Sequence, residues 1–449
     1  MTQTRRDFLK TCMMGSAGLA VASLGMPLPS FARTMGANDR IRVGIIGFSD
    51  RFRSSLLPCF MANAKELNFE IVAVSDIWKL RREEAVRHFK EKYNVDVKVF
   101  RNNEELYDAK ICDAVIISTA DFQHAQHCIQ AVKAGCDAYV EKPFAETMAD
   151  AREALKAVQE TGKIVQIGSQ RRSAPNYQAA NEYLRSGKFG KITMVEMTWN
   201  VNQPGRWRRK DLVSRCFEAD TDWKRFLLNR PYEKWDPRRY LEYRLFWPFS
   251  SGIPGQWMSH QIDTVHWFTG LSHPLSVAAN GGIYCWNDGR RNYDTVTAVF
   301  EYGKPDGSDN FQVLYSSRMH NEAGGVKELY FSNGGTLNLD TNEVSPDGGM
   351  QAWAAEEMGM KANLLDRFKL PDVKVATSAD TGGDDMTYLH MRNWMECVRS
   401  RKQPNAPVQA GYNHSIATIM CNAALRTGEK VTFDEKTQNV MAGGKVFKY

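Results

Sequence analysis

Short apolar runs alternate with longer amphipathic stretches over the first third of the chain. The runs have the length of buried strands, and the stretches between them have the periodicity of helices that pack on a sheet. The expected strands span residues 41–47, 69–75, 114–119, 137–140 and 164–167. The expected helices span residues 53–64, 79–93, 123–134 and 148–161. This alternation predicts a doubly wound parallel sheet of the Rossmann type.

The rest of the chain is richer in strand-like segments separated by turn signals. They span residues 192–199, 275–286, 293–302, 311–317 and 327–339, and two helices are expected at 386–401 and 410–425. A second domain with its own sheet follows from this change of pattern.

The bulk properties fit a globular protein with more than one domain. The chain has 449 residues, of which 43% are hydrophobic and 24% charged, so disordered and fibrous classes are excluded. The formal net charge of +6 is small for this length, and no nucleic-acid partner is expected. The nine cysteines form no C-x-x-C pair, and several lie in apolar runs, which indicates small buried side chains rather than disulfides or metal ligands.

The N-terminus has the features of an export signal. Arg5 and Arg6 precede a small-residue apolar run at 11–25, and Ser30 and Ala32 offer a small-x-small cleavage site. We interpret residues 1–32 as a twin-arginine signal peptide, with a frayed amphipathic helix or a membrane anchor as the alternative. The mature protein is then expected in the periplasm or otherwise exported, without stable membrane insertion, and with a tightly held cofactor loaded before export.

The turn after the first strand is expected to hold the cofactor's pyrophosphate. It keeps only Gly47 of the G-x-G-x-x-G pattern, because Ser49 and Phe52 replace the later glycines. We assign Gly47, Ser49, Asp50 and Arg51 to this site, with an ordinary strand-to-helix turn as the alternative.

Asp76 ends the second strand, where an acidic residue binds the adenosine ribose hydroxyls and favours NAD. Arg81 and Arg82 nearby keep NADP as the alternative.

Two polar turns follow later strands at the same sheet edge. Thr119, Asp121 and His124 follow one, and Glu141 and Lys142 follow the next, where Pro143 ends the strand. Ligands bind at this edge in open α/β sheets. A surface Lys-Glu pair is the alternative for the second turn.

The order of these elements resembles the glucose-fructose oxidoreductase and inositol dehydrogenase (Gfo/Idh/MocA) family. The resemblance includes the Glu141-Lys142-Pro143 strand end, the segment 168–172, the segment 184–191, the segment 258–263 and the tail 392–404. It implies an α/β fold in which a dinucleotide-binding domain (38–168) precedes a substrate and oligomerisation domain (169–449). The second domain is expected to contain a large open, mostly antiparallel sheet, and the protein to form a dimer or tetramer.

The resemblance also assigns roles to individual residues. Lys142 matches the catalytic lysine between nicotinamide and substrate, and His260 matches the family's histidine. The position four before it is Gln256 rather than the usual aspartate, so the acid/base pair is reduced to Lys142 and His260, with Asp263 as a candidate orienter. A histidine buried between the domains is the alternative for His260.

The segment 168–172 completes the assigned residues. We assign Gln170 to the cofactor site, with Thr119, Asp121, His124, Glu141 and Lys142, and we assign Arg171 and Arg172 to the substrate site, with Lys142, Gln256 and His260. A metal site at His260, Asp263 and His266 is not expected, because their spacing spreads them round a helix.

A stretch rich in tryptophan, tyrosine and arginine spans residues 199–257, and aromatic faces and guanidinium groups bind sugars well. We assign Trp207 to the substrate site and expect most of the others to pack loops onto the sheet. The sequence therefore predicts an exported NAD(P)-dependent oxidoreductase that acts on a CH–OH group of a sugar or glycoside. The alternatives are redox-neutral sugar cleavage or epimerisation, and a non-catalytic carbohydrate-binding protein.

Overall fold

The computed structural model describes residues 37–304, 306–372 and 384–448. The expected export signal at 1–32 lies outside these residues. Within the described part of the chain, no helix combines the length and the apolar character needed to cross a bilayer. Residues 41–449 belong to one compact unit.

The first sheet consists of six parallel strands in the order β3-β2-β1-β4-β5-β6. Its strands are β1 (Ile41–Ile46), β2 (Phe69–Ser75), β3 (Lys98–Phe100), β4 (Ala114–Ile117), β5 (Asp137–Val140) and β6 (Val165–Ile167). The expected Rossmann fold is confirmed. The central strands β4 and β5 are buried along their whole length, as expected for strands covered on both faces. β4 is an unbroken apolar run, whereas β5 begins with Asp137, which pairs with Arg401.

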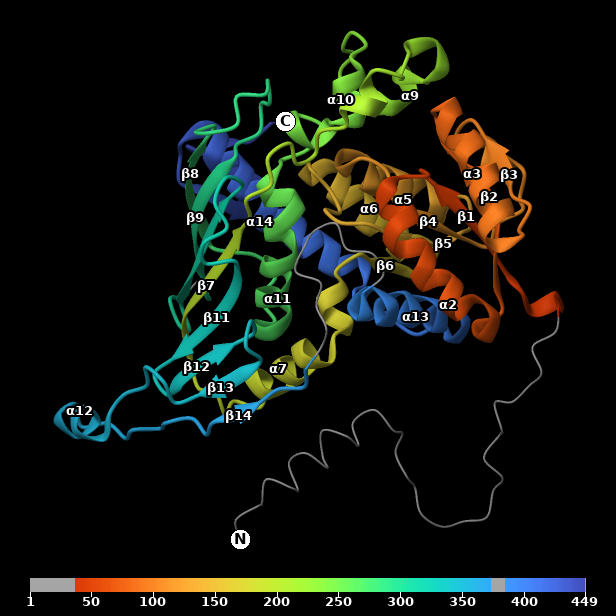
Figure 1. Cartoon of the computed structure of the whole chain (residues 1–449). Helices are drawn as coiled ribbons and strands as arrows, with labels where there is room; N and C mark the ends of the chain where they lie inside the picture. The colour runs from red at the N-terminus through yellow and green to blue at the C-terminus, as the bar shows by residue number, and fades with distance from the viewer. Residues whose placement is uncertain (1–36, 305, 373–383, 449) are drawn as a thin grey trace, which may run out of the picture. The chain divides into compact units, whose positions relative to one another are not determined.

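Helices cover both faces of this sheet (Figure 1). They are α2 (Leu57–Leu67), α3 (Lys79–Tyr93), α4 (Asn103–Asp108), α5 (His124–Lys133) and α6 (Met148–Thr161). Side chains of α2 and α3 share one apolar cluster, and those of α5 and α6 share another. The expected helices α3 and α6 have the predicted bounds, while the short β3 and α4 were not predicted.

The second sheet has eleven strands in the order β14-β13-β12-β11-β7-β10-β9-β8-β15-β16-β17. They are β7 (Ile192–Asn200), β8 (Ser276–Gly282), β9 (Thr295–Tyr302), β10 (Phe311–Arg318), β11 (Val326–Ser332), β12 (Gly335–Asn338), β13 (Glu343–Ser345), β14 (Phe368–Lys369), β15 (Val431–Asp434), β16 (Asn439–Ala442) and β17 (Lys445–Val446). All neighbours pair antiparallel except β7 and β10. The expected mostly antiparallel sheet is confirmed. The single expected strand at 327–339 is a hairpin, β11 and β12.

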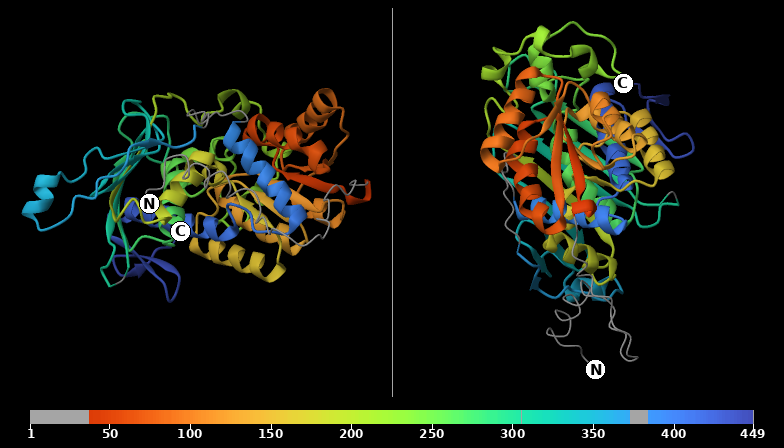
Figure 2. Two further views of the ribbon diagram at one scale, coloured as in Figure 1. Left: turned by 90° about the horizontal axis from the view of Figure 1, so that it is seen from below. Right: turned by 90° about the vertical axis from the view of Figure 1, so that its right-hand side faces the viewer.

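Three helices, α7 (Pro175–Arg185), α11 (Ser259–Thr269) and α14 (Val408–Thr427), lie on the side of the second sheet that faces the first (Figure 1). α14 packs on β8 and also on α6 of the first domain. The fourth, α13 (Asp385–Ser400), leaves the second domain and packs on α2, as the blue helix beside the first sheet in Figure 2 shows. The C-terminal helices therefore join the two sheets.

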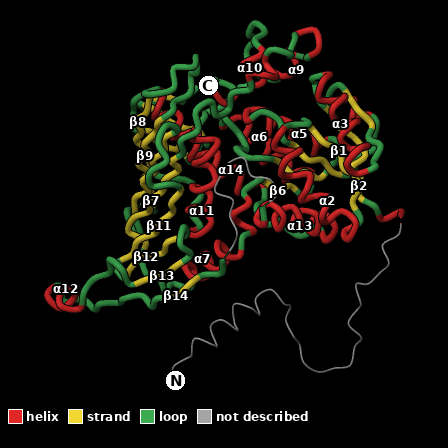
Figure 3. Tube along the Cα trace, viewed as in Figure 1, coloured by secondary structure: helices red, strands yellow, loops and turns green. Residues whose placement is uncertain are grey.

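Shorter helical segments complete the chain (Figure 3). They are η1 (Ala37–Asp39), η2 (Phe52–Leu56), η3 (Asp121–Gln123), η4 (Gln170–Ser173), α8 (Lys210–Val213), η5 (Glu218–Asp220), α9 (Trp223–Leu227), α10 (Pro237–Leu241), η6 (Tyr243–Leu245), η7 (Pro254–Met258) and α12 (Ala352–Glu357). Several of these, from α8 to η6, belong to a long connection after β7 that returns toward the first sheet.

Candidate active site

A cavity of about 520 Å³ lies at the carboxyl ends of the first sheet. Its walls come from the turns after β1, β2, β4, β5 and β6, from the connection after β7 and from η7 and α11. The assigned residues that line it are Gly47, Ser49, Asp50, Arg51, Asp76, Thr119, His124, Glu141, Lys142, Gln170, Arg171, Trp207, Gln256 and His260. Asp121 and Arg172 do not line it.

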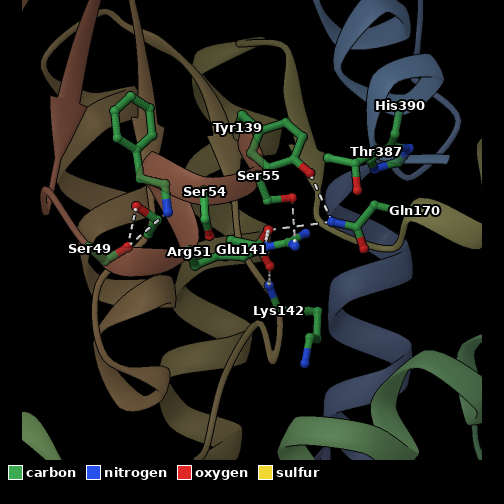
Figure 4. Close-up of polar contacts among 12 residues, drawn as sticks. Ser49, Arg51, Ser54, Ser55, Tyr139, Glu141, Lys142, Gln170, Thr387 and His390 are labelled. Atoms are coloured by element: carbon green, nitrogen blue, oxygen red, sulfur yellow. Dashed lines mark hydrogen bonds and ion pairs between the residues drawn. The ribbon is translucent and has the colours of Figure 1, made fainter. Parts of the chain in front are cut away.

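The turn after β1 keeps the one glycine that its geometry needs. Gly47 has a φ of +86°, and a Cβ there would come within 2.9 Å of Thr119 Cγ2. The Ser49 hydroxyl accepts from the Phe52 amide at 3.2 Å and donates to Ser118 Oγ at 3.2 Å (Figure 4). Ser49 therefore caps the helical turn that follows, while Phe52 is buried in the core rather than at the turn surface.

Asp50 sits on the cavity wall among arginines. Its carboxylate accepts from Arg81 at 2.9 Å and from Arg209 at 3.2 Å. Burial alone would raise the pKa of Asp50, but the charges of Arg81, Arg53 and Arg209 outweigh it and the pKa is lowered. Arg209 comes from the connection after β7, so this carboxylate ties that connection to the first domain.

Asp76 is held by the backbone. Its two carboxylate oxygens accept from the amides of Phe48 and Trp78, each at 2.9 Å. Arg82 donates to the Asp76 carbonyl at 2.7 Å, and Arg81 is held by Asp50 and Glu84. The carboxylate therefore stands fixed at the cavity edge, and both arginines are engaged by acceptors of the protein.

The turn after β4 offers a hydroxyl group without a partner. Thr119 Oγ1 is buried and has no hydrogen-bond partner among the described residues. The His124 ring lies between the carbonyl oxygens of Pro143, at 2.8 Å, and Thr119, at 3.2 Å, and burial lowers the pKa of His124. A buried hydroxyl beside Gly47 fits a bound phosphate or ribose oxygen.

Glu141 lies at the centre of a buried cluster (Figure 4). It accepts from Arg51 Nε at 3.0 Å and from Gln170 Nε2 at 3.4 Å, and Gln170 also donates to Tyr139 at 3.1 Å. Burial would raise the pKa of Glu141, but the charges of Arg51 and Lys142 outweigh it and the pKa is lowered. The side chain of Lys142 extends away from this cluster, so its ammonium group is an electrostatic neighbour of Glu141, while its backbone amide donates to Glu141 Oε2 at 3.2 Å.

Lys142 points its ammonium group across to the second domain, where Nζ donates to the backbone carbonyl of Gln256 in η7. Burial lowers the pKa of Lys142 to about 8, with the charges of Arg244 and Arg51 acting in the same direction against those of Glu141 and Asp121. A lysine with this pKa exchanges protons near neutral pH.

Helix α14 fixes the backbone that follows Lys142. The Phe144 amide donates to His414 Nε2 at 3.2 Å, and the Ala145 amide donates to Ser415 Oγ at 3.1 Å. A Cβ at Gly411 would come within 2.8 Å of Phe144, so only glycine permits this approach. These contacts of α14 with residues 144 and 145, which we call the clamp, therefore fix the backbone next to Lys142.

His260 lies in α11 against an aromatic wall. Its ring stacks on Trp199 at 5.8 Å, Trp199 stacks on Trp257 at 6.0 Å, and Trp207 contacts Trp257 at 5.4 Å. Burial and the charges of Lys142 and Arg171 lower the pKa of His260 well below its usual value, which favours the neutral imidazole.

The side-chain amide of Gln256 bridges Asp121 and Arg244, which an aspartate at that position could not do. Its Nε2 donates to Asp121 Oδ2 at 2.6 Å, and its Oε1 accepts from Arg244 Nε at 2.8 Å. Asp121 also accepts from Ser250 Oγ at 2.6 Å. A carboxylate at position 256 would face Asp121 directly, whereas the amide donates to one neighbour and accepts from the other.

The two arginines after β6 form ion pairs with buried carboxylates. Arg171 pairs with Glu328 and stacks on Trp199 at 5.7 Å. Arg172 pairs with Asp263 through two hydrogen bonds of 2.8 and 2.9 Å. Asp263 therefore does not orient His260, and the assignment of Arg172 to the substrate site loses its geometric basis.

Residues that the sequence did not single out also line the cavity. Thr387 and Asp384 come from the start of α13, and Asn103 comes from α4. The aromatic stretch contributes Trp199, Arg206, Arg209, Tyr240, Tyr243, Arg244 and Trp257. No motif near the first group in the sequence predicts a place in the cavity. The second group belongs to the stretch rich in tryptophan, tyrosine and arginine, of which only Trp207 was assigned to the substrate site.

The first sheet and its helices define a protein of the Rossmann class, and the cavity lies at the sheet edge where such folds bind their ligands. Residues 41–169 match the family model described as "Oxidoreductase family, NAD-binding Rossmann fold" (GFO_IDH_MocA). The first domain is therefore similar to the dinucleotide-binding domain that this family model describes.

The similarity to curated relatives covers only part of their length. An inositol 2-dehydrogenase of Salmonella typhimurium is 26% identical over 242 residues, which cover 54% of this chain and 66% of that enzyme. A scyllo-inositol 2-dehydrogenase (NAD(+)) of Bacillus subtilis is 36% identical over 123 residues, which cover 27% of this chain and 34% of that enzyme. The chain thus matches less than two thirds of the length of these relatives.

Solved structures are similar over nearly the whole fold. The WlbA dehydrogenase of Bordetella pertussis, in complex with NADH and UDP-GlcNAcA, has a TM-score of 0.62 at 16% identity and covers 88% of this chain and 98% of its own. An aldose-aldose oxidoreductase of Caulobacter crescentus has a TM-score of 0.58 at 15% identity and covers 88% and 100%. At these identities the likeness shows the fold.

Proposed function

We propose that this protein is an oxidoreductase that transfers a hydride between a sugar or polyol CH–OH group and a tightly bound nicotinamide cofactor. The observation that carries the proposal is the position of Lys142. It ends a buried Rossmann strand at the cavity, it has a pKa of about 8, and it shares that cavity with His260 and an aromatic wall. The inositol dehydrogenase relatives support a polyol or sugar substrate.

The residues present fit a nicotinamide dinucleotide. Gly47 and the buried Thr119 hydroxyl would hold the phosphates, and the fixed Asp76 carboxylate would accept from the ribose hydroxyls. When bound, the nicotinamide ring supplies the hydride acceptor.

Lys142 acts as the general base in this scheme. Its neutral amine takes the hydroxyl proton of the substrate while the carbinol carbon gives up its hydride, so that a carbonyl group forms and no free alkoxide persists. His260, as a neutral imidazole, positions the hydroxyl group. The Gln256 carbonyl holds Nζ in place for this transfer.

The connection after β7 supports retention of the cofactor between turnovers. We define residues 201–249 as the covering segment. It pairs with the first domain at the bridge between Trp78 and Thr221, at the 2.7 Å hydrogen bond from Gln123 to the Phe226 carbonyl, and at the Arg209–Asp50 ion pair. These contacts lie on the cavity wall, so exchange of a dinucleotide requires this segment to open.

A retained cofactor also fits export after folding, which the twin-arginine interpretation of residues 1–32 requires. The hydride taken from one substrate then returns to a second substrate, or to the same one after cleavage or epimerisation. We therefore place the protein outside the cytoplasm.

The test begins with the mature protein purified without added cofactor. After denaturation, the supernatant is assayed for NAD(H) and NADP(H). We expect close to one nicotinamide per chain, and sugars or inositols should change the nicotinamide absorbance of the intact protein. A protein that contains none and binds none on reconstitution would contradict the proposal and leave carbohydrate binding as its function.

A further inference from the structure

Arg244 is a cavity residue with an unusual set of partners. It lies in η6, its Nε donates to the neutral side-chain oxygen of Gln256 at 2.8 Å, and its guanidinium lies 4.6 Å from the centre of the Tyr243 ring. These contacts fix the plane of the guanidinium group. Among the described residues, no carboxylate lies within ion-pair distance of it.

Five other cavity arginines form ion pairs with carboxylates of the protein. Arg51 pairs with Glu141, Arg81 and Arg209 with Asp50, Arg171 with Glu328, and Arg225 with Glu104. Each of those guanidinium groups therefore has a carboxylate within ion-pair distance, with Asp50 shared by Arg81 and Arg209. The charge of Arg244 is met only by amide and aromatic groups.

Arg244 lacks a carboxylate partner because the side-chain amide of Gln256 lies between it and Asp121. Asp121 is the carboxylate nearest along this chain of contacts, but it is separated from Arg244 by Gln256, which donates to it at 2.6 Å. The Lys142 ammonium group also donates to Gln256, at the backbone carbonyl, but Glu141 and Asp121 act on it as electrostatic neighbours. Among the described residues, Arg244 thus lines the cavity without a carboxylate within ion-pair distance.

A fixed guanidinium group with Nε engaged presents its two terminal nitrogens to a ligand. That end-on pair of N–H donors matches the two oxygens of a carboxylate, and such charge-assisted bonds are stronger than those to a hydroxyl group. Binding of a neutral sugar would leave the charge of Arg244 uncompensated in a partly buried site. A ligand with one carboxylate would supply the missing charge.

We propose that Arg244 is a specificity-determining residue that binds the carboxylate of an acidic sugar, so that the substrate class is uronic acids and their glycosides rather than neutral sugars. This inference rests on the proposed function, because it places the sugar beside Lys142.

The experiment compares matched sugars on the holoprotein. Glucose and glucuronate, and galactose and galacturonate, are titrated while tryptophan fluorescence reports binding and nicotinamide absorbance reports hydride transfer. We expect each uronate to bind at least about tenfold more tightly than its neutral partner. Arg244→Gln should reduce that ratio to near one, and Arg244→Lys should retain part of it.

Arg42→Gln is the matched control. It removes one positive charge from an exposed pair with Asp113, away from the cavity, and should leave the ratio unchanged. If wild-type protein binds neutral sugars as tightly as uronates, or sugar phosphates more tightly than either, the inference is overturned whatever the variants do.

The two proposals fail in different ways. Absorbance changes with neutral sugars alone would support hydride transfer and contradict the role of Arg244. A uronate preference seen by fluorescence, without nicotinamide in the protein, would support the role of Arg244 and contradict the oxidoreductase.

Discussion

The ammonium group of Lys142 donates a hydrogen bond to the backbone carbonyl of Gln256, which lies one helical turn before His260. This bond joins the end of a Rossmann strand to the start of the helix that carries the second candidate acid/base residue. The distance from Lys142 to a bound sugar is therefore set by both domains together.

Replacement of Lys142 tests the assigned base. Lys142→Ala should lower kcat by about 10²–10⁴-fold, since a positioned general base contributes on that order. Nicotinamide content should stay near that of the wild type, because Gly47, Thr119 and Asp76 are untouched. Stopped-flow absorbance with saturating sugar measures the rate, and turnover within threefold of wild type would remove Lys142 from the mechanism.

The pH dependence of the wild-type enzyme follows from the same residue. The neutral amine is the active form, and the pKa is lowered to about 8, so kcat/KM for oxidation should rise with pH and level off above about 8. His260 stays neutral across this range because its pKa is lowered well below the usual value. A profile that is flat from pH 6 to pH 10 would contradict the assignment.

Asp76 should determine the preference between NAD and NADP. Its carboxylate would repel a 2′-phosphate, and its removal takes that repulsion away, while Arg81 and Arg82 remain nearby on their own acceptors. Asp76→Ser should shift the ratio of NADP to NAD binding toward NADP by at least about tenfold. Reconstitution of the cofactor-free protein with each nucleotide measures this ratio, and Glu70→Ser, on the same strand, serves as the control.

Variants of Arg172 and Asp263 distinguish a structural role of this ion pair from a role of Arg172 in substrate binding. Arg172→Ala should destabilise the protein by about 3–5 kcal/mol, because it leaves a buried carboxylate unpaired. The double variant Arg172→Met/Asp263→Leu should recover much of that loss in urea unfolding and keep the wild-type KM for sugar. A large rise in KM for the folded double variant would restore Arg172 to the substrate site.

The same pair predicts an acid-sensitive contribution to stability. The pKa of Asp263 is lowered, because the charge of Arg172 outweighs burial. The pair therefore stabilises the fold fully above the unfolded pKa of about 4, and this contribution falls as the pH drops below it. The double variant should lose less stability than the wild type between pH 5 and pH 3.

Gly411→Ala tests the clamp on the Lys142 loop. The added Cβ would meet Phe144 at 2.8 Å and Ile167 at 2.9 Å, which should cost about 1–3 kcal/mol of stability and reduce activity by displacing Lys142. Gln409→Ala, on an exposed position of the same helix, is the control. Equal urea midpoints for the two variants would contradict a tight approach at Gly411.

The Rossmann domain was predictable because its signals are local. Buried parallel strands read as unbroken apolar runs, and α3 and α6 begin and end where the sequence pattern does. The strands β13 to β17 were missed because two to four residues carry no periodicity. Their pairing depends on neighbours that are distant in the chain.

The candidate site was predictable only in part, for a similar reason. The strand-end position of Lys142, the turn at Gly47 and the fixed Asp76 follow from motifs within single loops. By contrast, Arg172 pairs with Asp263 across 91 positions of the chain. Gln256 bonds to Asp121 across 135 positions and to Arg244 across 12. No spacing rule reveals which partner a buried guanidinium group or amide takes.

The clamp on residues 144 and 145 has a consequence for biosynthesis. Its donors and acceptors are 270 positions apart, so every residue of the first sheet can leave the ribosome long before the loop after Lys142 finds its support. A chain that stops before α14 would keep the strands of the first sheet and lack the geometry at Lys142. Completion of the polypeptide, rather than folding of its first domain, is therefore the step that completes the candidate active site.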